Sequence, residues 1–399
     1  MKKDIMNWFS LRGVILDAVE VKDRILLKVR CPRTWCMCPK CTKSSRNFHD
    51  SSVRYKLHCL SGEKRVYIAC TVRRFYCRKC NKPFTEPLPP WMNGRYRYTK
   101  PLEELVSGEL ATSNFFEVSR KYGISAHTLL AILKRRAREV EIPDGELILN
   151  VDEHSYRGRD LKIGVAAANK KRFLAILPDD NQITLEKYFK SWPNEAKSRV
   201  REVCIDMKHS YLSVLKEELP HAKVVVDHFH VVREMSRQLE ETRKVIQEMG
   251  KRGERRINRF LLAKNAEDLS VREKRALARV FKAYRKFPTL QGAYFVKEKV
   301  REMYRCKTRV EAERKLDMLL SQLEHHEVGK LAEMRNTLTR WKPYILNFFE
   351  RRTTNAFIEG CHNKIKLVKR MSYGFRNFNN YVLKITLAML PFFFLNFPH

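Results

Sequence analysis

Two closely spaced pairs of cysteines lie near the start of the chain, at a spacing that allows thiolates to bind a metal ion. Cys38 and Cys41 form the first pair, and Cys77 and Cys80 form the second. Each pair can place two sulfur ligands on one Zn²⁺, so the two pairs together complete a closed tetrahedral structural site. The intervening residues suffice for a small sheet, and the pattern therefore predicts a zinc ribbon. The alternative is four free thiols, and Cys36 is the main rival ligand.

The use of cysteine across the chain favours metal binding over disulfides. Eight of the 11 cysteines fall within the first 80 residues, and the odd total argues against a fully paired set. In a reducing compartment, clustered cysteines are more often metal ligands than disulfides. Arg73 and Arg74 precede the second pair, so we expect phosphate contacts there. We expect Cys31, Cys59 and Cys70 to be small buried residues.

Acidic residues follow two apolar runs of strand length in the middle of the chain. Asp152 and Glu153 come after the run 147–151, and Asp206 comes after the run 203–205. Adjacent parallel strands that end in Asp bring two carboxylates to one edge of a sheet, where they can bind divalent metal ions. Because side chains alternate along a strand, we expect Glu153 to face away from Asp152. A single Asp at a strand end is more often a turn residue, so the third carboxylate that two-metal phosphoryl transfer needs must have a signal of its own.

That third carboxylate is predicted in the segment 353–370, which has the pattern of an amphipathic helix. A cluster of Thr and Asn can cap its start, and its apolar stripe consists of Ile358, Cys361, Ile365 and Val368. A second face carries Glu359, Asn363, Lys366 and Arg370, spaced at i, i+4, i+7 and i+11. This order makes sense if Glu359 binds metal while the other three residues follow a phosphate backbone. The alternative is an exposed amphipathic helix with a stray Glu.

Residues 115–134 have the pattern of a helix-turn-helix. Val118 and Tyr122 supply an apolar face, Gly123 can adopt the left-handed conformation of the turn, and Ser125 can cap the second helix. The second helix turns Leu129, Ile132 and Leu133 inward. We expect its leading residues to meet base edges and its basic end to lie near phosphates; these are Ala126, His127 and Thr128, then Lys134, Arg135 and Arg136. An ordinary helical hairpin is the alternative.

The order of the apolar runs indicates the elements that must position these residues. Five runs of strand length lie between 147 and 226, at 147–151, 161–167, 173–177, 203–205 and 224–226. The first three follow one another closely, as in an antiparallel meander, and helices near 185–192 and 211–219 separate the later two. This order predicts a mixed α/β sheet. Residues 1–90 alternate in short runs typical of strands, and 228–341 reads as almost entirely helical.

The charge balance points to a polyanionic partner. Among 399 residues, 80 Lys and Arg face 45 Asp and Glu, which gives a formal net charge of +35. Such an excess repels itself in a compact state unless a polyanion relieves it, so nucleic acid is the first candidate partner. A membrane surface is a weaker candidate partner, because no apolar stretch reaches the roughly 18–20 residues of a spanning helix. The N-terminal residues lack the apolar run of a signal peptide, and we expect a cytosolic protein.

Taken together, these segments resemble the bacterial insertion-sequence transposases of the DDE type, and specifically the ISL-three family. The zinc-ribbon pattern is similar from Cys38-Pro-Lys-Cys41 through Arg73-Arg-Phe-Tyr-Cys77-Arg-Lys-Cys80. Val151-Asp152-Glu153, Asp206-Met and Asp227-His-Phe-His230 match the family's strand-end elements. The most specific match begins at Thr354-Asn-Ala-Phe-Ile-Glu359 and continues through Arg370-Met-Ser-Tyr-Gly-Phe-Arg-Asn-Phe. One departure is Cys361-His362, where a more polar pair is expected.

The resemblance implies an RNase H-like catalytic core with Asp152, Asp206 and Glu359 as its metal-binding triad. Asp227 and His230 would support that triad by orienting metal, water or DNA. The implied cofactors are two Mg²⁺ ions, which Mn²⁺ can replace, and a structural Zn²⁺. The implied activity is DNA cleavage and strand transfer at insertion-sequence ends by two-metal phosphoryl transfer. Its partners would be terminal inverted repeats and target DNA, bound by at least a homodimer on the nucleoid in the bacterial cytoplasm.

The long interval between Asp206 and Glu359 implies a helical insertion within such a core. The expected organisation is a zinc ribbon at 1–90, a helix-turn-helix domain at 91–142, core segments at 143–232 and 346–399, and an insertion at 233–345. Two other functions remain as alternatives: a domesticated zinc-containing regulator that binds DNA without cutting it, and a structure-specific nuclease on the same core. A pure regulator has no need of three such carboxylates, and a nuclease would cut without joining.

Overall fold

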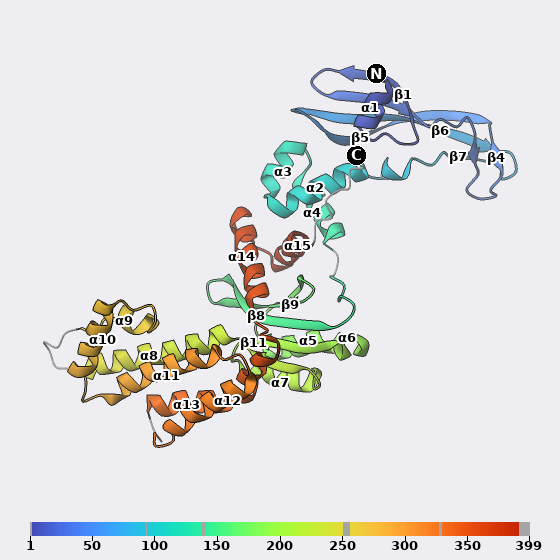
Figure 1. Cartoon of the computed structure of the whole chain (residues 1–399). Coiled ribbons are helices and arrows are strands. Elements are labelled where there is room, and N and C mark those ends of the chain that lie inside the picture. The colour runs from blue at the N-terminus through green and yellow to red at the C-terminus, as the bar shows by residue number, and fades with distance from the viewer. Residues whose placement is uncertain (1, 93, 138–139, 250–255, 327–328, 391–399) are drawn as a thin grey trace. The chain divides into compact units, whose positions relative to one another are not determined.

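The computed structural model describes residues 2–92, 94–137, 140–249, 256–326 and 329–390. The chain forms two compact units (Figure 1). The terminal unit contains Met1–Glu139 and Lys366–His399, and the central unit contains Val140–Ile365. The chain thus leaves the terminal unit once and returns to it. The expected organisation placed the whole of 346–399 in the core, whereas the structure groups its larger part with the N-terminal residues.

A five-stranded sheet forms the first part of the terminal unit. After α1 (Lys2–Trp8), the strands are β1 (Ile15–Val21), β2 (Ile25–Arg30), β5 (Phe48–Ser61), β6 (Lys64–Cys77) and β7 (Lys82–Thr85). They lie in the order β1-β2-β6-β5, with β7 paired to β6. Only β2 and β6 run parallel within this sheet. A small hairpin, β3 (Cys36–Met37) and β4 (Ser44–Ser45), carries the first cysteine pair.

Helices form the rest of the terminal unit. They are the short η1 (Pro90–Met92), α2 (Lys100–Thr112), α3 (Phe115–Tyr122), α4 (Ala126–Arg136) and α15 (Phe378–Met389). Gly123 ends α3 in the left-handed conformation with φ +65°, and the Ser125 side chain caps α4 by accepting from Thr128 N. The apolar residues predicted to pack between the two helices are buried: Val118, Tyr122, Leu129, Ile132 and Leu133. The predicted pair of helices and its turn are therefore confirmed.

The C-terminal helix α15 joins the terminal unit by packing on α2 and α4. Its buried Lys384 donates from Nζ to the carbonyl oxygens of Leu110 and Ser113, at the C-terminal end of α2. Those carbonyls have no partner within their own helix, and a cation there is favoured by the helix dipole. This contact and the packing of α15 on α2 and α4 join α15 to the N-terminal residues.

The central unit is built around a mixed sheet whose order is β10-β9-β8-β11-β12. The strands are β8 (Leu147–Arg157), β9 (Asp160–Ala167), β10 (Arg172–Ile176), β11 (Val200–Ile205) and β12 (Lys223–Val226). The first three pair antiparallel, while β11 lies parallel to both β8 and β12. The helices α5 (Gln182–Lys190), α6 (Asn194–Ser198) and α7 (His209–Glu218) connect the later strands. The predicted mixed α/β sheet is confirmed; only the short α6 was not foreseen.

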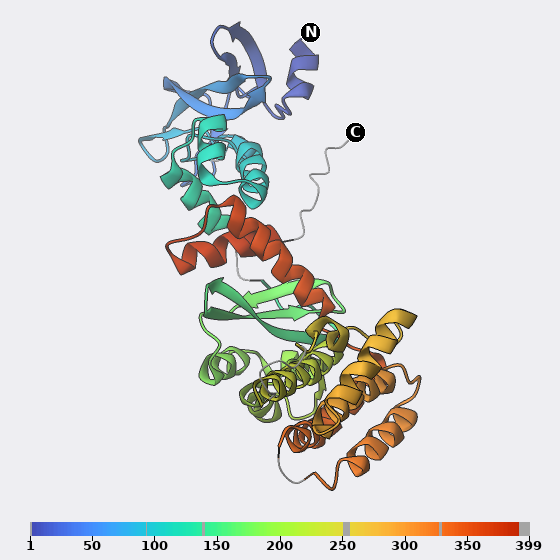
Figure 2. The ribbon, with the colours of Figure 1, turned by 90° about the vertical axis from the view of Figure 1, so that its left-hand side faces the viewer.

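A run of helices follows β12, coloured yellow to orange in Figure 2. They are α8 (His228–Met249), α9 (Arg259–Ala263), α10 (Val271–Ala283), α11 (Pro288–Tyr304), α12 (Arg309–Gln322) and α13 (Lys330–Arg351). Their apolar faces share one core with the sheet, which includes Met235, Val296 and Trp341. The chain then enters α14 (Ala356–Met371). Among the described residues, no helix is both long and apolar enough to cross a membrane.

Candidate functional site

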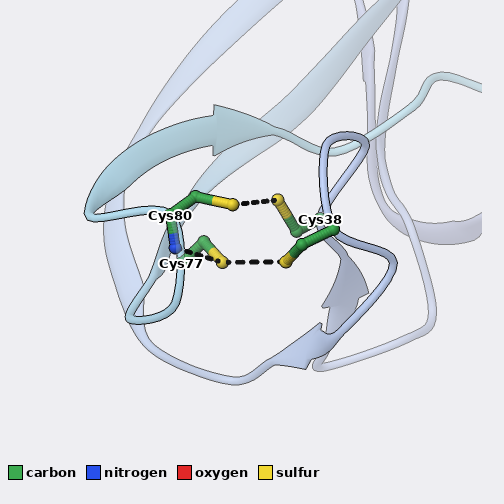
Figure 3. Close-up of side chains that lie close together, drawn as sticks. Cys38, Cys77 and Cys80 are labelled. Atoms are coloured by element: carbon green, nitrogen blue, oxygen red, sulfur yellow. Dashed lines mark hydrogen bonds between the residues drawn. The ribbon is translucent and has the colours of Figure 1, made fainter.

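The four cysteines of the two pairs come together at one end of the terminal unit's sheet. Figure 3 shows Cys38, Cys77 and Cys80 with their sulfur atoms turned toward a common centre. The Sγ atoms of Cys38 and Cys80 lie 3.9 Å apart, and those of Cys41 and Cys77 lie 3.5 Å apart. Four thiolates at about 2.3 Å from one Zn²⁺ in a tetrahedron have sulfur atoms about 3.8 Å apart. The residues therefore fit a structural zinc ion.

The other nearby cysteines are not part of this cluster. Cys36, the rival ligand, is buried in a small apolar cluster beside Phe75 and Phe84. Burial raises its pKa, whereas backbone N–H groups, that of Cys41 foremost, lower the pKa of the Cys38 thiol to about 7. A readily formed thiolate favours metal binding. Of the three cysteines expected to be buried, Cys70 is, while Cys31 and Cys59 remain partly exposed.

A second cluster of polar residues lies in the central unit, where β11 and β12 end beside the middle of β8. Ile205 of β11 pairs with Val151 of β8 on one side and with Val226 of β12 on the other. The next residue along each strand is an aspartate: Asp152, Asp206 and Asp227. Because the three strands are parallel and in register, these carboxylates emerge side by side at one edge of the sheet.

His230 lies between two of these aspartates, in the first turn of α8. Its Nδ1 atom is 2.7 Å from Oδ2 of Asp206, and its Nε2 atom is 3.8 Å from Oδ2 of Asp227. Burial would lower the pKa of His230, but the hydrogen bond and the charge of Asp206 outweigh it and raise that pKa. Burial also raises the pKa of Asp206, to which the charge of Asp152 adds. The carboxylates of Asp152 and Asp206 therefore lie close together and partly shielded from water, and a bound cation would stabilise their charged forms.

Glu359 reaches the same edge of the sheet from α14. Ligand atoms of Asp152, Asp206 and His230 all lie within 4.8 Å of one another, and so do those of Asp227, His230 and Glu359. The two groups share His230, so the third acid approaches from the side of Asp227. Clustered carboxylate oxygens are the ligands that Mg²⁺ prefers. The donor set of this cluster therefore fits divalent cations.

The segment 353–355 fixes the start of α14 on the strand ends. The side-chain amide of Asn150 on β8 donates to the carbonyl oxygen of Thr354 at 3.0 Å. The backbone N–H of Asn355 donates to Oδ1 of Asp227 at 3.5 Å, and its side-chain N–H donates to Oδ1 of Asp206 at 3.4 Å. Asn355 is completely buried. It thus connects two of the aspartates to the helix that carries Glu359.

His362 connects α14 to the first strand of the site. Its Nδ1 atom is 3.3 Å from Oδ2 of Asp152, and its ring packs against His154 with centroids 4.8 Å apart. Burial would raise the pKa of Asp152, but the hydrogen bond and charge of His362 lower it. Sequence reasoning noted His362 only as a departure from the family pattern. His362 and Asp152 lie far apart in the sequence, so no local pattern predicts their contact.

A hollow of about 510 Å³ opens over these groups. It is lined by Asp152, Glu153, Asp206, Met207, Lys208, Tyr211, His230, Arg233, Glu234 and Arg237. The hollow is thus lined both by Asp152, which lies beside His362, and by its neighbour Glu153. Its carboxylate accepts hydrogen bonds from Lys208 Nζ and, at 2.7 Å, from the Tyr211 hydroxyl. Arg233 also lies at this site, with its Nη2 atom 3.9 Å from Oδ2 of Asp206. The sequence pattern did not predict this residue.

Some of the residues predicted to contact DNA in the terminal unit already make contacts within the protein. Arg73 is already engaged: it pairs with the buried Glu86 at 2.8 Å and donates to the carbonyl oxygen of Cys31. Arg135 donates to Glu103 and stacks on Tyr96, so it joins α4 to α2. Both guanidinium groups support the fold. Arg74 lies in a half-exposed pair with Asp50.

Most of the other predicted contact residues are exposed to solvent. His127 and Lys134 are exposed on α4, and Thr128 is half-buried beside Ser125, with 3.0 Å between the two hydroxyl oxygens. On α14 the three predicted contact residues, Asn363, Lys366 and Arg370, are exposed, while the predicted apolar stripe is buried. The amphipathic character expected for this helix is therefore observed, and its polar face is free to meet a ligand.

Comparison with known proteins gives these features a context. The chain is 26% identical over 362 residues to the transposase for insertion sequence element IS1001 of Bordetella parapertussis, covering 88% of each protein. It is 22% identical over 388 residues to the transposase for insertion sequence element IS1557 of Mycobacterium tuberculosis, covering 89% of this chain and 86% of the relative. Residues 149–385, more than half of the chain, match a family described as Transposase, the ISL-three group of the DDE type. The resemblance seen in the motifs is confirmed: this chain belongs to the ISL-three family of DDE transposases.

Proposed function

We propose that this transposase cuts DNA at the ends of its insertion sequence and joins the freed ends to target DNA. The observation that carries the proposal is the meeting of Asp152, Asp206 and Glu359 around His230 at one edge of the sheet. The strand order β10-β9-β8-β11-β12, with three antiparallel strands followed by two parallel ones, supports an RNase H-like core. The helices between β12 and α14 would then be an insertion into that core.

Each polar group at the strand ends has a role in this proposal. Asp152, Asp206 and Glu359 would hold two Mg²⁺ or Mn²⁺ ions, which when bound supply Lewis-acid stabilisation of the attacking and leaving oxygens. Asp227 and His230 would orient the triad. The carboxylate of Asp206 accepts from His230 and Asn355, which fixes its rotamer before any ligand arrives. Arg233 and Arg237 line the same hollow, where their charge would attract a phosphate group.

The terminal unit would recognise the ends of the element. We propose that the zinc ribbon and the helix-turn-helix bind the terminal inverted repeats, with His127 and Thr128 at base edges and Lys134 and Arg74 near phosphates. Arg73 and Arg135 would support these elements from within, through their pairs with Glu86 and Glu103. Pairing two ends for joining requires at least a dimer on DNA. The protein would act on the nucleoid in the bacterial cytoplasm.

A strand-transfer assay tests the proposal. The full chain is incubated with labelled duplexes that end in the element's terminal repeats, unlabelled target DNA and Mg²⁺. We expect cleavage at the repeat end followed by joined product. Cleavage without joining would contradict strand transfer and favour a structure-specific nuclease. Binding without either reaction, in Mg²⁺ and in Mn²⁺, would overturn the enzymatic proposal in favour of a zinc-containing regulator.

A further inference from the structure

The C-terminal end of α14 carries a tyrosine in an energetically costly position. The helix ends with backbone N–H groups of Tyr373 and Gly374 donating to the carbonyl oxygens of Arg370 and Lys369. In this type of helix end the residue in the left-handed conformation is usually glycine, because a side chain there is strained. Here Tyr373 holds that position, with φ +53°. A residue held in a strained conformation is a reason to look for function at that site.

Tyr373 is 90% exposed, so its ring contributes little to the packing of the protein. The ring lines an open hollow of about 590 Å³ in the terminal unit, between the start of α3 and the loop from α14 to α15 (the red helices of Figure 2). Phe116, in the first turn of α3, lines the same hollow and is 71% exposed. Neither side chain contributes much to a core, so two large aromatic faces are available to a ligand.

The polar groups of the hollow suit a nucleotide. Arg376 is exposed there and contributes a positive charge, and Lys366 and Arg370 lie on the helix that leads into the loop. Asn114 and Asn377 use their side-chain oxygens to cap α3 and α15, so their N–H groups remain to donate to a ligand. The buried Ser372 hydroxyl has no hydrogen-bond partner within the described residues. Glu117 is the single acid among the lining residues.

The geometry points to a binding site for an unpaired nucleobase of a DNA strand, stacked on Tyr373 and Phe116. In a duplex, each base already stacks on its neighbours, so exposed aromatic rings gain most from a base that has left the helix. Arg376 would contact the adjoining phosphate, and the amides of Asn114 and Asn377 would meet the base edge. This inference deepens the proposed function, on which it rests for DNA as the ligand; the reaction itself is not required.

Binding in the absence of divalent ions tests the site apart from catalysis. The full chain is titrated with a short fluorescein-labelled duplex carrying one unpaired thymine, and with the same duplex fully paired. We expect Tyr373→Ala to weaken binding of the first duplex about tenfold, the usual effect of losing one stacked base, and to leave the second unchanged. Tyr373→Phe should bind like wild type. Phe260→Ala, which removes another exposed ring, on α9, is the matched control and should change neither affinity.

A second variant separates folding from binding. Tyr373→Gly removes the ring and also the strain at φ +53°, so it should raise the melting temperature while losing the preference for the unpaired base. With 2-aminopurine as the unpaired base, wild type should quench its fluorescence and Tyr373→Gly should not. An unchanged preference for the unpaired base in Tyr373→Ala and Tyr373→Gly, or unchanged quenching in Tyr373→Gly, would overturn the site and leave the proposed transposition intact. Failure to bind either duplex would overturn the site alone, because the strand-transfer assay with element ends tests the proposed transposition separately.

Discussion

His362 on α14 and Asp152 on β8 lie 3.3 Å apart between Nδ1 and Oδ2, so the helix that carries Glu359 also holds the first aspartate of the site. The opposite side of the His362 ring faces Gly164 on β9, where an added Cβ atom would lie 2.6 Å from Nε2. That close approach is possible only because residue 164 has no side chain. The positions of two site carboxylates are thereby coupled through one imidazole.

This coupling predicts the effect of Gly164→Ala. The added methyl group must displace the His362 ring, which would move Asp152 relative to Glu359. We expect DNA cleavage to fall at least about tenfold, since small displacements in active sites have large effects on rate. DNA binding should stay near wild type. Gly360→Ala is the control, because a Cβ atom there meets nothing within 4 Å and alanine favours a helix. Equal activity of the two variants would show that His362 does not position Asp152.

The cysteine cluster predicts how the terminal unit responds to loss of zinc. Cys77→Ser would remove one of the four proposed zinc ligands, and a structural zinc site supplies folding free energy locally. We expect residues 1–90 to lose protection from proteolysis while the central sheet stays folded. Recognition of element ends should weaken more than nonspecific cutting. Cys36→Ser, outside the cluster, should retain zinc by metal analysis. Equal loss of recognition and cutting in Cys77→Ser would mean that the zinc ribbon supports the catalytic core.

The aspartates at the strand ends could be found from the sequence because their signal is local. Each follows an apolar run, and parallel pairing places the ends of such runs together, so the neighbourhood of Asp152 and Asp206 followed from the pattern. The contact of His362 with Asp152 had no such signal, because it depends on where α14 meets β8. The same holds for Arg73. A phosphate contact was expected for it, but its guanidinium group pairs with Glu86, which follows the second cysteine pair in the sequence.

The long hairpin of β5 and β6 was harder to predict for a different reason. The first half of β5 is exposed on both faces, so it shows none of the alternation that marks a half-buried strand. Lys384 is a similar case. A lysine within an apolar helix usually faces solvent, yet the Nζ atom of Lys384 donates to the carbonyl oxygens of Leu110 and Ser113 at the C-terminal end of α2. Such pairings are decided by packing between distant segments, which local patterns do not contain.

The salt dependence of binding tests the polar face of α14. Lys366 is exposed, and each phosphate contact contributes a slope of about −0.9 to the dependence of log affinity on log salt concentration. We expect Lys366→Ala to flatten that slope by about one contact without changing sequence preference. Lys223→Ala, which removes a lysine paired with Glu350, is the control and should leave the slope unchanged. A changed preference with an unaltered slope would contradict a phosphate contact.

His58 should make the terminal unit sensitive to acid. Its Nε2 is 2.8 Å from the carbonyl oxygen of Phe9 and its Nδ1 is 2.9 Å from the Thr99 hydroxyl, so the neutral ring donates to the first and accepts from the second. Burial lowers the pKa of His58, and the bond to Phe9 opposes this only in part. Below the ordinary value of about 6.5, the unfolded chain therefore binds a proton that the folded chain does not. Stability should fall with decreasing pH by at most about 1.4 kcal/mol per unit.

Denaturant unfolding between about pH 7.5 and pH 5 measures this effect. His58→Gln should be less stable than wild type at the higher pH and should lose less stability as the pH falls. His325→Gln, which replaces an exposed imidazole, should follow the wild-type pH dependence. The same slope in wild type and His58→Gln would show that another group is responsible.

Glu359 is the residue on which the enzymatic proposal depends most. Glu359→Gln keeps the size of the side chain and the helix but removes the charge that would help to hold a metal ion near Asp227 and His230. We expect near-complete loss of both cleavage and joining, measured with labelled element ends in Mg²⁺, while binding of the ends stays within a few-fold of wild type. Glu153→Gln is the comparison, because that carboxylate already accepts from Lys208 and Tyr211 and should matter less. If Glu359→Gln joined ends at the wild-type rate, the triad would be wrong, and Asp227 would be the next residue to test as the missing ligand.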